Sequence, residues 1–317
     1  MTGVRVAIFD MDGVLYRGDQ VLPYAREALA RLRAAGWAVY FATNNSSASR
    51  AEYVARLERL QLGGDLDHVV TSAFATAHYL DRLEPRPRDV FVVGGDGLRE
   101  EIRAVGIGVR DPKDTPGIHP PGRAAIDGLD PAAMRAYLTG LELPPPPDTV
   151  VVGLDMHLTY AKLAEAQRAV LAGARFIASN KDRAYPVEGR LLPGAGTIVA
   201  AIEVATGRNA LCIGKPEPWL FQETLNRAAS LDSPGGSRDS PGGSRDSPGG
   251  SSDRAVVIGD STDYDIVAAH RVGAVGVLIT TGLTEPGAEA RASGEAVPDH
   301  VISSLDQLFA LPAFAGA

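Results

Sequence analysis

The chain contains a single cysteine among its 317 residues. With only Cys212 available, neither an intrachain disulfide nor a cluster of thiolate metal ligands can form. Cys212 lies within the apolar run 210–213, and we interpret it as a buried structural thiol.

Positive charge is scarce relative to negative charge. The chain carries 31 Lys and Arg against 39 Asp and Glu, which gives a formal net charge of −8 at pH 7. Nucleic-acid binders usually present a basic face, so we expect no nucleic-acid partner. An acidic protein that handles an anionic substrate must instead supply positive charge locally.

Long apolar runs are absent as well. No run approaches the ~20 apolar residues that cross a bilayer. Residues 1–5 lead directly into a strand, without the basic segment and apolar region of a secretion signal. We therefore expect no membrane partner and a cytoplasmic location.

What the sequence does contain is a regular alternation of apolar patterns. β-Branched and aromatic runs alternate with segments that place apolar residues at helical spacing, which is typical of a parallel α/β sheet. With 45% hydrophobic and 22% charged residues, the chain can form one large or two medium domains. We predict a doubly wound parallel-sheet core of class α/β. Its first strands are expected at 4–9, 37–42 and 69–70, and its first helices at 22–35, 49–60 and 72–83.

A second α/β series begins after Pro85 and Pro87. Its expected strands are 89–94, 149–154 and 175–178, and its expected helices 97–105, 131–138 and 160–172. We interpret this series as a smaller inserted α/β domain, which divides the chain into core residues 1–85, inserted residues 86–190 and core residues 191–317. The second core part resumes with helix 196–206 and strand 210–213.

One segment of the second core part is repetitive. The unit Asp232–Arg238 recurs at 239–245 and imperfectly at 246–252. Its Pro, Gly, Ser and Asp content supplies no apolar residue to bury, so we expect a disordered surface loop at about 232–253. We interpret it as an inert expansion.

Four polar stretches each follow an apolar run. They are Asp10–Gly13, Thr43–Ser46, Gly214–Pro216 and Gly259–Asp265. In an open parallel sheet, ligands bind beyond the carboxyl ends of the strands, so residues just after several strands converge there. The spacing thus predicts one site that combines carboxylates, hydroxyls, amides and a lysine.

The first stretch offers a nucleophile and an acid. A carboxylate can attack phosphorus to form an aspartyl phosphate, and we assign this role to Asp10. A second carboxyl group can protonate the leaving oxygen and later deprotonate the attacking water, which we assign to Asp12. The alternative is that Asp10 to Gly13 only form an Asx-turn at a strand end.

The second and third stretches fit a phosphoryl group. We favour Thr43 and Asn44 as phosphate contacts at the positive end of the following helix, although plain N-capping by a nearby serine explains the same residues. Lys215 follows a strand, where it would hold Asp10 and the phosphate together and offset charge in the transition state. A lone lysine is otherwise a solvated surface group.

The fourth stretch completes an oxygen-rich cation site. Mg²⁺ takes one or two protein carboxylates together with phosphate and waters, so Asp10, the carbonyl of Asp12 and Asp260 form a suitable ligand set. We expect Asp265 to hold second-shell waters or Lys215. The alternative is helix capping by Asp263 with dipole stabilisation by Asp265.

These four stretches resemble the motifs of haloacid dehalogenase superfamily phosphatases. The inserted segment, with residues 176–182 and 193–196, resembles the capped subfamily (class IIA) that contains p-nitrophenyl phosphatases, phosphoglycolate phosphatases and pyridoxal-phosphate phosphatases. The resemblance implies a Rossmann-like core, an inserted cap and Mg²⁺, and the motif roles that it implies agree with those given above. It also adds Asn45 to the residues around the phosphate.

The resemblance extends to the cap and also has exceptions. It implies that the loop 180–188 faces the active site, with Tyr185 and Asp182 as contacts of the leaving group. A tyrosine packed on the cap sheet and an Asx-turn are the alternatives for these two residues. Tyr264 stands where relatives commonly have threonine, and Ser261 where they have arginine or asparagine.

These observations predict an Mg²⁺-dependent phosphomonoesterase that acts on a small phosphorylated metabolite. Phosphoglycolate, glycerol phosphate and pyridoxal phosphate are expected candidates, with p-nitrophenyl phosphate as an in vitro substrate. The alternatives are a phosphotransferase to an alcohol and a non-catalytic aspartyl-phosphate signalling module. A cap and an acid at Asp12 favour turnover. The resemblance also makes a homodimer through the cap plausible.

Overall fold

The computed structural model describes residues 4–110, 145–187, 190–232, 255–281 and 288–315. The predicted helix 131–138 and nearly all of the predicted repeat loop lie outside these residues. Within them, every helix is too short or too polar to cross a bilayer.

The core is a six-stranded sheet in the order β15-β14-β13-β1-β4-β5, and every neighbouring pair is parallel. Its strands in chain order are β1 (Val6–Asp10), β4 (Ala38–Thr43), β5 (Val69–Thr71), β13 (Ala255–Gly259), β14 (Val275–Ile279) and β15 (His300–Ile302). β1 is central, with β4 on one side and β13 on the other. The strands that follow β1 in the chain are therefore added first on one side of it and later on the other. Doubly wound sheets bind ligands at such a switch point.

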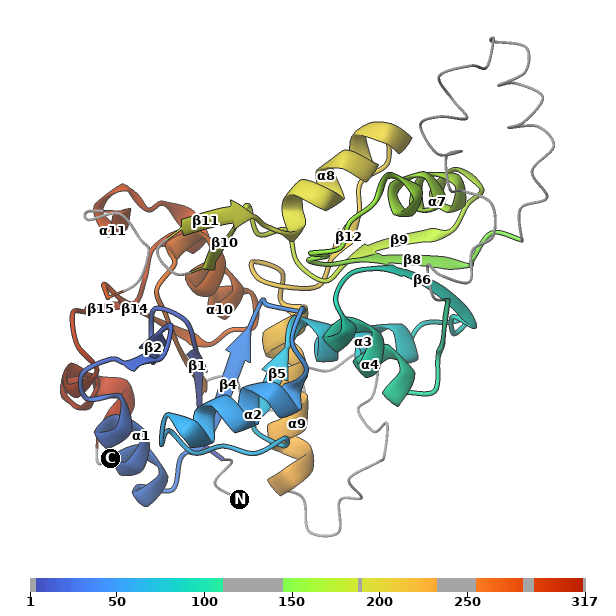
Figure 1. The fold of residues 1–317 in the computed structure, drawn as a ribbon. Helices are drawn as coiled ribbons and strands as arrows, with labels where there is room; N and C mark the ends of the chain where they lie inside the picture. The colour runs from blue at the N-terminus through green and yellow to red at the C-terminus, as the bar shows by residue number, and fades with distance from the viewer. Residues whose placement is uncertain (1–3, 111–144, 188–189, 233–254, 282–287, 316–317) are drawn as a thin grey trace, which may run out of the picture.

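Helices cover both faces of this sheet (Figure 1). Ala7 and Phe9 of β1 point to one face, which packs against α1 (Ala25–Ala34), α2 (Arg50–Arg59) and the C-terminal 3₁₀ turns. Ile8 points to the other face, which packs against α3 (Ser72–Asp81), α9 (Trp219–Asp232) and α10 (Val267–Arg271). Because both faces are covered, β1 is an uninterrupted buried run, as a central parallel strand requires.

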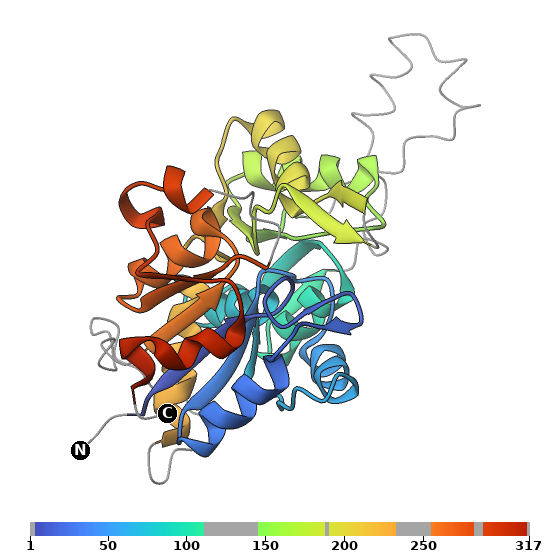
Figure 2. The ribbon, with the colours of Figure 1, turned by 90° about the vertical axis from the view of Figure 1, so that its left-hand side faces the viewer.

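A second, five-stranded parallel sheet lies beyond the carboxyl ends of the core strands (Figure 2). Its order is β12-β9-β8-β6-β7, formed by β6 (Asp89–Val93), β7 (Gly108–Arg110), β8 (Thr149–Val152), β9 (Arg175–Ala178) and β12 (Leu211–Cys212). One face packs against α4 (Asp96–Ala104) and the other against α7 (Tyr160–Leu171) and α8 (Ala195–Thr206). We call this unit the cap.

The cap includes elements that follow residue 190, where the sequence predicted its boundary. β12 pairs with β9, and α8 buries Ile198, Val199 and Ile202 in the same cluster as the cap strands. The apolar face of α8 thus belongs to the cap sheet, although its helical pattern alone could equally have packed on the core.

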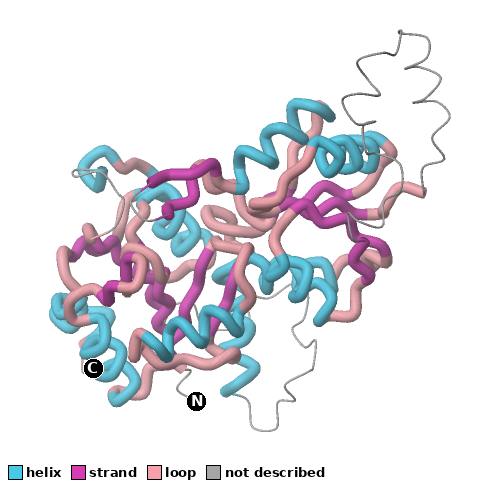
Figure 3. The backbone as a smooth tube through the Cα atoms, in the orientation of Figure 1, coloured by secondary structure: helices cyan, strands magenta, loops and turns pink. Residues whose placement is uncertain are grey.

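The two sheets share a continuous apolar core. One buried cluster runs from Ile8 of the core sheet through α3, α9 and α4 to Val92 of the cap sheet. α3 is buried on nearly all sides because it lies between these layers. Two short antiparallel hairpins, which the apolar patterns did not predict, complete the fold (Figure 3). They are β2 (Tyr16–Arg17) with β3 (Gln20–Val21), and β10 (Ala184–Val187) with β11 (Arg190–Pro193).

Candidate active site

The first carboxylates stand at the end of β1. Asp10 is its last residue and is only 8% exposed, whereas Asp12 is exposed two residues later. Between them and β2 the chain turns through Gly13, whose φ of 84° favours glycine. The turn is fixed by the Gly13 N–H, which donates to the Tyr16 carbonyl at 2.9 Å, and by the Thr281 hydroxyl, which donates to the Gly13 carbonyl at 2.8 Å.

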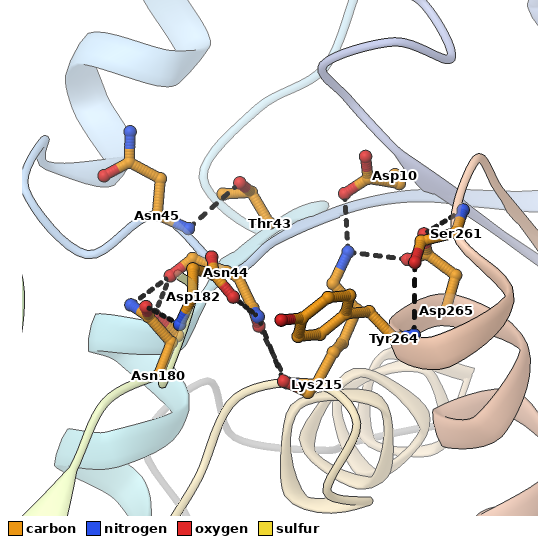
Figure 4. Close-up of polar contacts among 11 residues, drawn as sticks. Asp10, Thr43, Asn44, Asn45, Asn180, Asp182, Lys215, Ser261, Tyr264 and Asp265 are labelled. Atoms are coloured by element: carbon orange, nitrogen blue, oxygen red, sulfur yellow. Dashed lines mark hydrogen bonds and ion pairs between the residues drawn. The ribbon is translucent and has the colours of Figure 1, made fainter. Parts of the chain in front are cut away.

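Lys215 reaches this turn from the segment that leads from β12 of the cap to α9 of the core. Its Nζ lies 2.7 Å from Asp10 Oδ1 and 2.6 Å from Asp265 Oδ1 (Figure 4). The residue is 4% exposed. Burial by itself would lower the pKa of Lys215, but the two carboxylates raise that pKa above its ordinary value. Lys215 is therefore a buried cation beside Asp10 and not a solvated surface lysine.

Asp265 is brought into the site by a π-helical turn, Thr262–Ile266, that follows β13. The Ser261 carbonyl accepts from the amides of both Asp265 and Ile266, at 3.0 and 3.2 Å. The Ser261 amide in turn donates to Asp265 Oδ2 at 3.1 Å. The wide turn lays the Asp265 side chain across Gly259, where an added Cβ would lie 2.2 Å from the Asp265 Cβ. Only glycine fits at this strand end.

Three carboxylates converge beside β1. Asp10, Asp260 and Asp265 each offer an oxygen, and these oxygens lie within 4.8 Å of one another. Burial, followed by the nearby Asp265 and Asp260, raises the pKa of Asp10 well above its ordinary value, against the opposing effect of Lys215. When all three carboxylates are ionised, the single lysine leaves two negative charges uncompensated. A divalent cation that prefers oxygen ligands, such as Mg²⁺, fits this donor set.

In the second stretch, the side chain of Asn44 contacts the backbone of Lys215. Asn44 Oδ1 accepts from the Lys215 amide at 2.7 Å, and Asn44 Nδ2 donates to the Lys215 carbonyl at 3.1 Å and to Asp182 Oδ1 at 2.8 Å. Both hydrogens of the Asn44 amide are thus engaged. In this arrangement the Asn44 side chain has no donor left for a phosphoryl oxygen, so a phosphate contact by this residue stays a prediction for its backbone N–H.

Thr43 and Asn45 organise the loop that enters α2. Thr43 Oγ1 accepts from the Asn45 amide at 3.2 Å, and Asn45 Oδ1 accepts from both the amide and the hydroxyl of Ser47. Ser49 then caps α2 through a reciprocal bond with Glu52. The side chain of Asn45 therefore forms an Asx-turn, and the serine cap that the alternative expected is Ser49.

Two cap residues and Tyr264 of the core lie close to Asn44 and Tyr53. Asp182 follows β9 and binds Asn44, as described above, and burial raises its pKa. Tyr185 of the β10–β11 hairpin lies near Tyr53, whose pKa is raised by burial and then by Asp12 and Tyr185. Tyr264 points its ring toward Asn44 and Asp182 (Figure 4). The predicted cap residues thus face the core, with Asp182 on Asn44 and Tyr185 beside Tyr53.

Three residues near Asp12 were missed from the sequence. Burial raises the pKa of Asp12 although the residue is exposed, because protein atoms partly desolvate its carboxyl group, while Arg56 and Lys215 lower it. Tyr53 and Arg56 lie on α2 at a spacing of three residues, and the Arg56 guanidinium stacks over the Tyr16 ring at 4.5 Å. The i, i+3 spacing directly after the second stretch is the signal that could have revealed this pair.

Comparisons with known proteins identify the family of the chain. A family model described as haloacid dehalogenase-like hydrolase matches residues 7–108, and one described as HAD-hydrolase-like matches residues 212–308. The glycerol-3-phosphate phosphatase of Gallus gallus is 33% identical over 324 residues, which cover 99% of this chain and 93% of that protein. The chain belongs to the haloacid dehalogenase-like hydrolases.

A human and a mycobacterial protein are also similar to this chain. Human chronophin is 34% identical over 313 residues, 95% of this chain and 90% of its own length. A glycerol phosphate phosphatase from Mycobacterium tuberculosis, solved in complex with magnesium, matches with a TM-score of 0.73 and 30% identity, over 96% of this chain and 76% of that one. The predicted family, the α/β fold and the assignment as a phosphatase are therefore confirmed.

Proposed function

We propose that this haloacid dehalogenase-like hydrolase is an Mg²⁺-dependent phosphomonoesterase that hydrolyses a small phosphorylated metabolite through an aspartyl phosphate on Asp10. The observation that carries the proposal is the contact of Lys215 Nζ with both Asp10 and Asp265, at 2.7 and 2.6 Å, in a buried site. Such an arrangement keeps Asp10 aligned and supplies the local positive charge that an acidic protein needs for a phosphate.

The reaction divides into two displacements at phosphorus. In the first, an Asp10 carboxylate oxygen forms a bond to phosphorus while the bond from phosphorus to the ester oxygen breaks, and Asp12 gives its proton to that leaving oxygen. In the second, Asp12 takes a proton from water, the water oxygen bonds to phosphorus, and the Asp10–phosphorus bond breaks to release inorganic phosphate. Lys215 offsets negative charge on the phosphoryl oxygens in both steps.

The residues that would hold a divalent cation are Asp10, the carbonyl of Asp12 and Asp260, with Asp265 beside them. When bound, Mg²⁺ would neutralise charge on the phosphate and on the carboxylate cluster. The fit rests on the three converging oxygens described above, and the magnesium complex of the mycobacterial relative supports the same metal. Asp265 is shared between this cluster and Lys215, so it links the cation site to the lysine.

The substrate class follows from the relatives and from the covered site. Relatives are named for glycerol phosphate and for 4-nitrophenyl phosphate, both of which are small monoesters. The cap sheet lies over the carboxyl ends of the core strands, so the leaving group of an ester bound there would face the cap (Figure 2). A panel of phosphoglycolate, glycerol phosphate, pyridoxal phosphate and p-nitrophenyl phosphate, compared by kcat/KM, ranks the candidates.

The nucleophile is tested by Asp10→Asn with Asp263→Asn as the matched control. Asp263 is an exposed aspartate beside the cation site, but it is not part of the carboxylate cluster. We expect Asp10→Asn to abolish turnover with the fold intact, Asp263→Asn to retain turnover, and acid-quenched wild-type enzyme to carry phosphate on the Asp10 peptide. Substantial turnover by Asp10→Asn would reject covalent catalysis by this residue.

The same assay separates hydrolysis from the alternatives. Phosphate released in large excess over enzyme supports an enzyme, whereas a single stoichiometric phosphorylation supports a signalling module. New phosphoesters formed when glycerol or another alcohol is added would identify a transferase. Loss of turnover with a chelator, restored by Mg²⁺, tests the metal.

A further inference from the structure

The end of cap strand β9 contacts one core residue, Asn44, at two points. Asp182 Oδ1 accepts from Asn44 Nδ2 at 2.8 Å, and Asn180 Nδ2 donates to the Asn44 carbonyl at 2.7 Å. Asn44 and Asn180 are buried, and Asp182 is partly buried. The cap therefore fixes both the main chain and the side chain of this core residue.

Asn44 transmits that contact to the catalytic lysine. Its amide group spans the main chain of Lys215, with Oδ1 accepting from the Lys215 N–H and Nδ2 donating to the Lys215 carbonyl. At its other end the lysine is held by Asp10 and Asp265. A continuous path of hydrogen bonds thus runs from Asp182 through Asn44 and Lys215 to the nucleophile (Figure 4).

The chemistry of Asp182 suits this path. A carboxylate accepts hydrogen bonds but donates none when ionised, so it favours the orientation that turns the Asn44 Nδ2 toward it. The reversed amide would place Asn44 Oδ1 against the carboxylate and Nδ2 against the Lys215 N–H, which are both repulsive. The bond also uses a charged acceptor, which makes it stronger than a bond between neutral groups.

We propose that Asp182 is a positioning residue that acts through Asn44, so that Lys215 is aligned with Asp10 only while the cap loop carrying Asp182 is seated on the core. This role deepens the proposed function and rests on it. It differs from the leaving-group contact expected from the family resemblance, because Asp182 acts on the phosphoryl side of the reaction. Tyr264, whose ring points toward the same carboxylate, lies beside this path (Figure 4).

The kinetic test compares Asp182→Ala, Asp182→Asn and Asn44→Ala on p-nitrophenyl phosphate and glycerol phosphate. A misaligned lysine slows the chemical step for every ester, so we expect Asp182→Ala to lower kcat by about 10- to 100-fold on both substrates with little change in KM. Asp182→Asn, which keeps an acceptor oxygen, should lose less. The double variant of Asp182→Ala with Asn44→Ala should be no slower than Asn44→Ala alone, because both changes break one path.

Amine labelling measures the position of Lys215 without catalysis. Brief treatment with acetic anhydride, followed by peptide mass spectrometry, should modify Lys215 slowly in the wild type and faster in Asp182→Ala and Asn44→Ala, with the other lysines as internal references. Lys181→Ala is the matched control, since the neighbouring Lys181 pairs with Glu203 at 2.7 Å and is not part of the path. This control should change neither the rates nor the labelling of Lys215.

Three results would overturn the positioning role. The first is an effect of Asp182→Ala that is confined to KM, or a fall in kcat that differs between the two esters. The second is a double variant whose loss of kcat is the product of the two single losses. The third is unchanged labelling of Lys215 in a folded Asp182→Ala protein. If the wild type hydrolyses no phosphomonoester, the proposed function fails instead, and the labelling still decides whether Asp182 positions Lys215.

Discussion

Gly259→Ala tests the arrangement of Asp265 most directly. The added Cβ would lie 2.2 Å from the Asp265 Cβ and 2.3 Å from its Cγ, whereas ordinary contacts begin at 3.4 Å. Gly259 belongs to the buried central strand β13, so Asp265 has to retreat by roughly 1.2 Å if the strand holds its place. That displacement changes the position of Asp265 relative to Lys215, which it contacts at 2.6 Å.

The expected effect is mainly catalytic. Misplacement of a catalytic group by ~1 Å costs about 10²-fold in rate, so we expect kcat on p-nitrophenyl phosphate to fall by about that factor. The overpacked strand end should also lower the free energy of unfolding by about 1–3 kcal/mol. Steady-state phosphate release measures the first effect, and thermal unfolding of the same preparation measures the second.

Gly207→Ala is the matched control. Gly207 has φ of 66° at the end of α8, and an added Cβ there meets no atom within 4 Å. Its left-handed backbone makes alanine cost about 1–2 kcal/mol, a similar loss of stability, with no expected effect on kcat. A folded Gly259→Ala enzyme with a wild-type kcat would refute the idea that Asp265 must lie against the strand end.

Three further predictions follow from the titratable groups. Asp12→Asn should slow hydrolysis of glycerol phosphate more than of p-nitrophenyl phosphate, whose anion leaves unaided, and equal losses would argue against the acid role. The pKa of Asp10 is raised in the folded protein, so the folded protein binds a proton at this residue more tightly than the unfolded chain does. The free energy of unfolding of the metal-free protein should therefore fall as the pH rises from ~4, where the unfolded chain loses this proton, through the raised pKa. Thermal unfolding with a chelator measures this slope, and Asp10→Asn should flatten it. Burial raises the pKa of the Cys212 thiol to about 12, so iodoacetamide at pH 8 should alkylate it only after unfolding, and rapid labelling of the folded protein would contradict this.

The sequence predicted the regular elements well where an apolar pattern carried them. Helix 160–172 and strand 175–178 match α7 and β9 within a residue, because buried faces impose a visible period. The sequence did not predict which strands pair with each other. The placement of β12 beside β9 depends on hydrogen bonds between strands far apart in the chain, and no local pattern encodes which sheet a two-residue strand joins.

The candidate site shows the same division. Its charged members could be named from the sequence, because each lies at or shortly after the end of a predicted strand. That rule does not explain why Lys215 meets the core carboxylates, because Lys215 follows β12, which belongs to the cap sheet. The contacts of Asn44 could not be named from the sequence. An amide can bind a phosphate, cap a helix or hold a neighbouring backbone, and only the approach of Lys215 and Asp182 selects the third of these. Tyr16, Tyr53 and Arg56 were missed because the i, i+3 spacing of Tyr53 and Arg56 shows only that the two residues share a helix face, and no local pattern shows which residues lie opposite that face.

The sequence by itself determined that Asp10, Asp12, Lys215 and Asp260 lie at or just after strand ends of an α/β protein, because the apolar run of a strand and the polar residues that follow it are local properties. The tertiary structure alone decided that Lys215 is held by Asp10 and Asp265 at one end and by Asn44 at the other, and that a cap residue, Asp182, completes this hold. These are distances between residues that lie far apart in the chain. They are fixed by how two sheets pack around α3, which a linear pattern does not contain.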